Sequence, residues 1–140
     1  MARGFTATET IAASPDIVWA RLTDWDRATE WMKGVDSLGT DGELGAGGAL
    51  VFQARGREHR SEVVAWDPPR VLGLKSVQGG VSAVYTYTLA AEGEGTRLTL
   101  DAACETTGFL YGLAAPFIGY AMEKTDAPQV ANLKALIEAD

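Results

Sequence analysis

Hydrophobic and polar residues alternate over several segments of this chain, and the alternation predicts an antiparallel sheet. Successive side chains of a strand point to opposite faces, so an alternating segment has one wet and one apolar face. Glycine, proline and acidic turn residues separate these segments, as is typical of a sheet built from hairpins. We expect strands over residues 5–12, 49–55, 59–66, 71–77, 81–90 and 96–106.

Two short helices are predicted between the first strand and the second. Ser14 is suited to the N-cap, Pro15 to the first helical position and Asp16 to the positive first turn. Thr23 or Asp24 can cap a second helix that runs through Trp31 and ends at Lys33-Gly34. A glycine-rich stretch, residues 39–48, follows and leads into the next strand, and its glycines within residues 45–48 are expected to form a flap.

A long amphipathic helix is predicted over residues 109–137. Pro116 and Pro128 interrupt it, and Asp126 can cap a new segment, so we expect a kink or short break near Pro128. The stripe can be either plain core or the wall of a cavity under the sheet. Its apolar positions recur at helical spacing: Leu110, Leu113, Phe117, Ala121, Val130, Leu133 and Ile137.

Length and charge restrict the function. The 140 residues, 46% of them hydrophobic, suffice for one domain with a substantial core. The net charge of −7 disfavours nucleic acid and anionic lipid headgroups as partners. No segment approaches the roughly 20 apolar residues of a membrane span, and no secretion signal is visible at the start. With a single cysteine, Cys104, these features lead us to expect a cytoplasmic protein without stable membrane insertion.

Several positions together resemble the START-like, or SRPBCC, superfamily of polyketide cyclase/dehydrase and lipid-transport proteins. The resemblance covers nearly the whole chain, so we expect residues 1–140 to form one START-like domain. It implies an α+β helix-grip fold, in which seven antiparallel strands wrap around a long C-terminal helix and enclose a hydrophobic cavity. The positions that carry it are Ile11 to Pro15, Val18-Trp19, Leu22 to Asp24, Trp31, Val63, Asp67 to Arg70, Gly95-Thr96 and Leu133-Lys134.

The alternation also predicts which side chains face inward. On the segment 81–90, Tyr85 and Tyr87 share a face with Leu89, so we expect both tyrosines on the inner face. Their hydroxyls would each need a partner, which can be a ligand oxygen, water, backbone or solvent at the sheet rim. On the segment 59–66 we favour His59, Ser61, Val63 and Ala65 as the inward set.

Three side chains are candidates for chemistry, and each has a plainer interpretation. His59 is the only histidine and so the first candidate for acid–base catalysis, but its charged neighbours indicate a solvated hairpin end. Glu9 shares the parity of Phe5 and Ile11, so its carboxyl lies either on the inner face or at an edge. Cys104 is interpreted as a small buried hydrophobe.

We predict that the protein binds or carries a small hydrophobic ligand, such as a lipid, polyketide or other aromatic molecule, in an internal cavity. The alternative is a polyketide cyclase/dehydratase-like enzyme that uses the same cavity, with catalytic residues unassigned. One histidine and one cysteine cannot supply a zinc or iron site, and we expect no cofactor. The expected ligand wall consists of Trp31, Phe52, Leu72, Leu74, Tyr85, Tyr87, Leu98, Leu100, Leu113 and Phe117.

Overall fold

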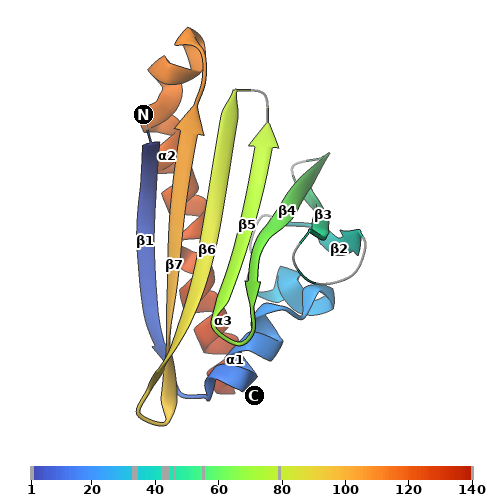
Figure 1. The fold of residues 1–140 in the computed structure, drawn as a ribbon, viewed down its shortest axis with the longest axis vertical. Coiled ribbons are helices and arrows are strands. Elements are labelled where there is room, and N and C mark those ends of the chain that lie inside the picture. The colour runs from blue at the N-terminus through green and yellow to red at the C-terminus, as the bar shows by residue number, and fades with distance from the viewer. Residues whose placement is uncertain are drawn as a thin grey trace.

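The computed structural model describes residues 2–32, 35–41, 45, 47–54, 56–78 and 80–139. They form one antiparallel sheet of seven strands in the order β1-β7-β6-β5-β4-β3-β2 (Figure 1). The expected helix break at Lys33-Gly34, Arg55 at the end of a predicted strand, and part of the expected flap lie outside the described residues. The strands are β1 (Ala2–Ile11), β2 (Ser37–Asp41), β3 (Ala49–Ala54), β4 (Arg57–Asp67), β5 (Val71–Gln78), β6 (Val81–Glu92) and β7 (Gly95–Thr106).

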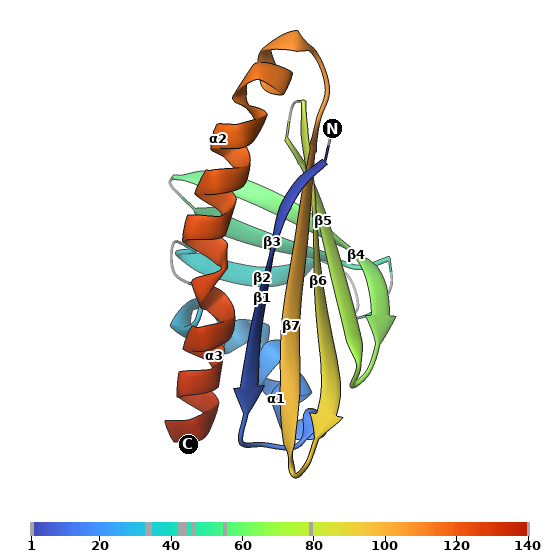
Figure 2. The ribbon, with the colours of Figure 1, turned by 90° about the vertical axis from the view of Figure 1, so that its left-hand side faces the viewer.

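The helices all lie on one side of the sheet. Two helices, α2 (Phe109–Asp126) and α3 (Pro128–Ala139), run in line along the sheet, while α1 (Pro15–Leu22) lies at the end where α3 finishes (Figure 2). A 3-10 helix, η1 (Trp25–Glu30), follows α1. This is the α+β helix-grip arrangement that the sequence led us to expect.

The predicted helix start at Ser14-Pro15 is confirmed, with one difference. Ser14 occupies the N-cap in extended conformation, but its side chain makes no capping hydrogen bond. Proline at the first turn and Asp16 beside the positive helix end therefore define the start. The buried face of α1 packs under the sheet, where the Trp19 ring meets Trp66 of β4 edge-on at 5.2 Å between centroids.

Strand β2 was not predicted from the alternation pattern. It pairs with β3 from Ser37↔Gln53 to Asp41↔Ala49 and overlaps the start of the glycine-rich stretch, before the residues expected to form a flap. It is short, contains Gly39 and buries none of its side chains fully. An edge strand of this kind gives no apolar alternation, which is why the sequence pattern did not reveal it.

The predicted interruption near Pro128 is confirmed as a single residue, Ala127, between α2 and α3. Ala127 keeps helical dihedrals (φ −58°, ψ −37°), so the two helices stay in phase. Phe117 and Leu133 are therefore about 4.4 turns apart and lie on nearly opposite faces. The expected single stripe is wrong on this point: Leu133 is buried under the sheet, whereas Leu113 and Phe117 are 63% and 76% exposed.

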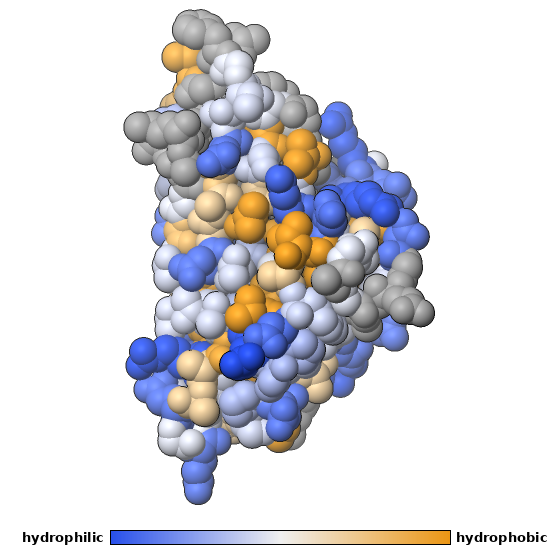
Figure 3. Space-filling model, viewed as in Figure 1, coloured by the Kyte–Doolittle hydropathy of each residue, from blue (hydrophilic) through white to orange (hydrophobic). Residues whose placement is uncertain are grey.

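The outer face of the sheet is polar at one edge and more apolar in the middle. On β1 and β7, threonines and Asp101 form a hydrogen-bonded ladder, with Thr6 donating to Asp101 at 2.8 Å. Over the middle strands, apolar side chains gather on the face opposite the helices (Figure 3), and Val64 and Val77 are exposed there. The face that packs against the helices carries the larger apolar side chains and forms the core.

Close backbone approach at Gly95 generates the first prediction. A Cβ at this position would lie 2.5 Å from the Ile11 carbonyl oxygen, whereas one at Gly39 would meet nothing within 4 Å. We expect Gly95→Ala to lower the free energy of unfolding by about 1–3 kcal/mol, because the backbone must shift. The matched control, Gly39→Ala, should change it by less than about 0.5 kcal/mol in urea unfolding. Equal effects would contradict the close approach.

Candidate functional site

The strand registers align inward-facing side chains into rows across the sheet. Antiparallel pairing places partner residues on the same face, so each row runs through several strands. One row passes through Tyr85 and the next through Tyr87. The Tyr85 row is Val63, Leu74, Tyr85, Ala102 and Phe5, and the Tyr87 row is Trp66, Leu72, Tyr87, Leu100 and Ala7.

Burial differs along the length of this concave face. Near α1 and α3 the side chains are packed, with Leu72 and Leu100 fully buried and Tyr87 2% exposed. Beyond Tyr85, toward the start of α2, the next row carries small side chains: Ser61, Ser76, Ala83 and Cys104. Ser76, Ala83 and Tyr85 are only partly buried. The partly exposed positions at this point of the concave face therefore lie on β5 and β6, because Ser61 and Cys104 in the same row and the other four members of the Tyr85 row are buried.

A β-bulge in β4 changes one predicted face. The register shifts between Val63 and Ala65, so that Ala65 pairs with Gly73 and Trp66 pairs with Leu72. Ala65 therefore faces outward, and the expectation that it faces inward with Val63 is wrong. Because the extra residue inverts the alternation, Trp66 instead turns inward onto α1.

Both tyrosine hydroxyls are bonded to the C-terminal helices. Tyr85 donates a hydrogen bond to the Asp126 carboxylate, at the end of α2. Tyr87 donates to Oε1 of Gln129, in the first turn of α3, at 2.7 Å. Gln129 in turn donates from Nε2 to Oδ1 of Asp126 at 3.3 Å. These four side chains form a continuous network, called here the Asp126 network, that joins β6 to the α2–α3 junction.

Burial and the nearby carboxylate both affect the tyrosines. Burial raises the pKa of Tyr85, and the charge of Asp126 and its hydrogen bond raise it further. Burial raises the pKa of Tyr87 as well, with a smaller contribution from Asp126. Both shifts keep the hydroxyls protonated, since the phenolate would be poorly solvated and close to another negative charge.

Trp31 packs beside the Asp126 network. Its ring is 1% exposed and meets Tyr87 edge-on, with the centroids 6.4 Å apart. Its carbonyl oxygen accepts a hydrogen bond from Asn132 of α3 at 3.3 Å. Its indole Nε1 is buried and finds no acceptor among the residues that the structure describes. A buried donor of this kind is available to a bound water or ligand.

The structure brings together eight of the ten side chains expected to form the ligand wall. Leu72, Leu74, Leu98 and Leu100 are buried on the same face as Tyr85 and Tyr87. Trp31 contacts Tyr87, and Phe52 lies farther along the face, partly buried. Leu113 and Phe117 do not join them, because they lie on the exposed side of α2. Whether the eight contact a ligand stays a prediction.

The three candidates for chemistry take different positions. His59 is half-buried on the concave face, with its ring stacked on Phe52 at 5.1 Å, rather than at a fully solvated hairpin end. Glu9 pairs with Leu98 and is half-buried on the concave parity of β1. Cys104 is buried, and burial raises the pKa of its thiol, which disfavours the reactive thiolate.

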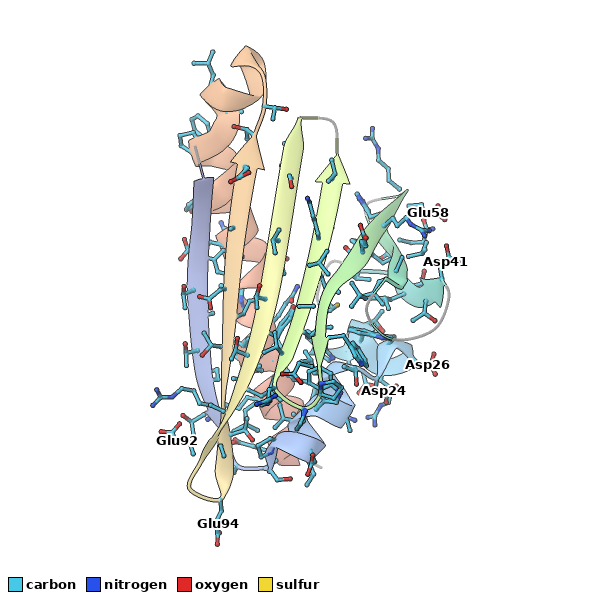
Figure 4. All side chains as sticks on the ribbon, in the orientation of Figure 1. Asp24, Asp26, Asp41, Glu58, Glu92 and Glu94 are labelled. Carbon is cyan, nitrogen blue, oxygen red and sulfur yellow. The ribbon has the colours of Figure 1, made fainter. Side chains whose placement is uncertain are left out.

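Six acidic side chains lie away from this face, at two sides of the molecule (Figure 4). Glu92 and Glu94 mark the β6–β7 hairpin, and Asp24, Asp26, Asp41 and Glu58 lie on the opposite side of the molecule (Figure 4). In the described part of the chain, no three His, Cys, Asp or Glu side chains gather to hold a metal ion. None of the helices so described is long and apolar enough to cross a membrane.

Sequence reasoning missed Asp126 and Gln129 as members of the site. Asp126 was considered only as a helix cap, and Gln129 was not singled out. One signal was present: two polar residues flank Pro128, three positions apart, and therefore share a helix face with the apolar residues Val130 and Leu133. Polar residues on an apolar face indicate buried partners.

Comparisons with known proteins agree with this architecture. The family model "Polyketide cyclase / dehydrase and lipid transport" matches residues 2–138. The protein TTHA0849 from Thermus thermophilus is 24% identical, with a TM-score of 0.75 and 97% of each chain covered. The Zhui aromatase/cyclase from Streptomyces sp. R1128 is 18% identical, with a TM-score of 0.77 and coverage of 99% of this chain and 94% of that one.

A plant enzyme has the same fold. A point mutant of norcoclaurine synthase from Thalictrum flavum, in complex with a transition-state analogue, is 15% identical. Its TM-score is 0.77, and the match covers 99% of this chain and 96% of the other. At these identities the solved structures establish the fold alone. A search of curated proteins finds no match to the sequence.

The raised pKa of Tyr87 predicts alkaline destabilisation. The unfolded chain releases this proton near pH 10, before the folded protein does, so the stabilising contribution is complete below about pH 10 and is lost above it. In Tyr87→Phe, the fall in the free energy of unfolding between about pH 10 and 11 should be smaller by about 1 kcal/mol. Tyr120→Phe, at an exposed position, is the control and should keep the wild-type slope. Identical slopes for all three proteins in urea unfolding would contradict the shift.

Proposed function

Because the chain belongs to the polyketide cyclase / dehydrase and lipid transport family, we propose that it binds a small apolar or aromatic molecule between the sheet and α2. One observation carries the proposal: Tyr85, Ser76 and Ala83 form a partly exposed stretch of the concave face on β5 and β6, beside the packed core and the Asp126 network. Ligand sites typically combine an apolar surface with a few oriented polar groups. The apolar wall would hold the body of the ligand, and the network would orient it.

The printed titles of the solved neighbours support small-molecule binding. Norcoclaurine synthase from Thalictrum flavum is described in complex with dopamine and hydroxybenzaldehyde, both small aromatic molecules. We place a ring of this kind against the small side chains beyond Tyr85, among them Ser76 and Ala83, on β5 and β6. Native mass spectrometry of freshly purified protein would reveal a co-purifying molecule directly.

A cyclase/dehydratase-like activity is the second candidate, and the Asp126–Tyr85 hydrogen bond is the observation that favours it. A carboxylate beside a phenol can accept a proton and return it to a bound substrate. This activity would use the same concave face. Release of a cyclised product from a linear poly-β-ketone thioester would distinguish it from binding alone.

Filling the concave face should remove binding. Ala83 lies on the concave face of β6, and Ala103 lies on the outer face of the adjacent β7. We expect Ala83→Phe to weaken binding of the neutral apolar dye Nile red by at least about 10-fold, because the added ring occupies the ligand position. Ala103→Phe makes the same change on the opposite face and should keep the wild-type affinity in a fluorescence titration. Equal affinities for both variants would place the dye elsewhere.

Substitution of His59 distinguishes a binding protein from an enzyme that uses this imidazole. Its ring lies two rows from Tyr85, beyond Ser61 and Ser76, so it does not belong to the Asp126 network. We expect His59→Gln to leave Nile red affinity within about 2-fold of wild type, the outcome of a carrier. If the imidazole were a general base, turnover of the thioester would instead fall by about 10²–10⁴-fold with binding preserved. Such a loss would exclude the carrier interpretation.

A further inference from the structure

One charged group sets the direction of every hydrogen bond in the Asp126 network. A carboxylate only accepts hydrogen bonds, so Gln129 must present its NH₂ group to Asp126 and its carbonyl oxygen to Tyr87. Tyr87 is thereby the donor to Gln129, and Tyr85 is the donor to Asp126. The hydroxyl hydrogens of Tyr85 and Tyr87 are both donated to protein acceptors, so neither is available to a ligand.

The chemical consequence falls on Tyr85, because this hydroxyl donor and its acceptor Asp126 are the partly exposed members of the network, whereas Tyr87 and Gln129 are buried. A phenol whose hydrogen is already donated can only accept further hydrogen bonds. A ligand oxygen with no hydrogen, such as a ketone or an ether, therefore gains nothing from Tyr85 unless the Tyr85–Asp126 bond breaks. That rupture would deprive a half-buried carboxylate of a donor.

The negative charge of Asp126 also restricts the ligand, because it disfavours an anion at Tyr85. A ligand carboxylate placed at Tyr85 would meet both an acceptor-only phenol and the Asp126 carboxylate behind it. Like charges in a partly desolvated site repel strongly. The indole N–H of Trp31, buried beside Tyr87, is one of two buried indole donors with no described partner, the other being that of Trp25. A hydroxyl oxygen can accept from such a donor while donating its own hydrogen.

We propose, building on the ligand-binding function above, that this site selects neutral aromatic molecules bearing a hydrogen-bond donor, such as a phenol, and excludes carboxylates. The Tyr85 oxygen accepts a hydrogen bond from the ligand, and Asp126 fixes the orientation of the Tyr85 hydroxyl. The small side chains beyond them contact the ring. Fatty acids are excluded as ligands at this end of the concave face. The raised pKa of Tyr85 supports the assignment, because its hydroxyl keeps its proton and its bond to Asp126.

Three naphthalenes of similar size test this selectivity on the full chain: 2-naphthol, 2-methoxynaphthalene and 2-naphthoate. Near pH 7 they present a donor, an acceptor without a hydrogen, and an anion. By isothermal titration, we expect 2-naphthol to bind at least about 10-fold more tightly than 2-methoxynaphthalene, as a hydrogen bond near a charged group allows. The naphthoate should bind most weakly.

A charge-removing variant identifies the residue responsible. Asp126→Asn keeps the shape but allows an amide to face Tyr85, so the affinity for 2-naphthoate should rise by at least about 10-fold while the preference for 2-naphthol shrinks. Glu123→Gln removes the same charge from an exposed position of the same helix. It should leave all three affinities within about 2-fold of wild type.

The outcomes separate the two proposals. If no naphthalene binds and Nile red does not bind either, the proposed function fails. If the three probes bind equally, or 2-naphthoate binds most tightly, the binding function stands and the selectivity is overturned. Should Asp126→Asn fail to fold, the order of the three probes on the unaltered protein still decides. An equal gain in naphthoate affinity for Glu123→Gln would assign the effect to net charge and overturn the role of Asp126.

Discussion

The constraint on which the rest of this structure depends is antiparallel pairing that continues across the whole sheet, from β1 at one edge to β2 at the other. Each register aligns inward side chains with those of the next strand, so residues distant in sequence become neighbours in a row. The row through Tyr85 joins residues from five strands. A slip of one residue anywhere would turn a whole set of apolar side chains to solvent. The core and the candidate site are both products of this pairing.

The Asp126 network depends on the sheet and the helices together. β6 supplies two hydroxyls on alternate positions, and the α2–α3 junction supplies a carboxylate and an amide three positions apart, about one helical turn. The spacing of about 6–7 Å between alternate strand residues exceeds the rise of about 4.5 Å over three helical residues by a difference that the side chains can span. Two pairs of polar groups can therefore meet without distorting either element. Satisfying four partly or fully buried polar groups at once also specifies how the helices lie on the sheet.

One local irregularity, the bulge in β4, and one regular feature, the helical phase kept across Pro128, decide which face several side chains occupy. The bulge in β4 turns Ala65 outward and Trp66 inward, which lets Trp66 meet Trp19 of α1. Ala127 keeps helical dihedrals between α2 and α3, which leaves Phe117 on the face opposite Leu133. At the bulge the sequence pattern continues smoothly, and the added residue changes the geometry. In the helices the regular helical period itself separates Phe117 from Leu133, because about 4.4 turns lie between them.

The sequence by itself determined the α+β architecture, the strand–turn alternation and the inward parity of Tyr85, Tyr87, Leu98 and Leu100, because these follow from near-neighbour spacing. It did not determine the short edge strand β2, whose side chains stay exposed and give no apolar pattern. Nor did it determine that Asp126 and Gln129 bond to tyrosines about 40 positions earlier. Only the tertiary structure decided this, because a hydrogen bond between a strand and a helix depends on how the helix lies and turns on the sheet, and local sequence periodicity carries no information on either.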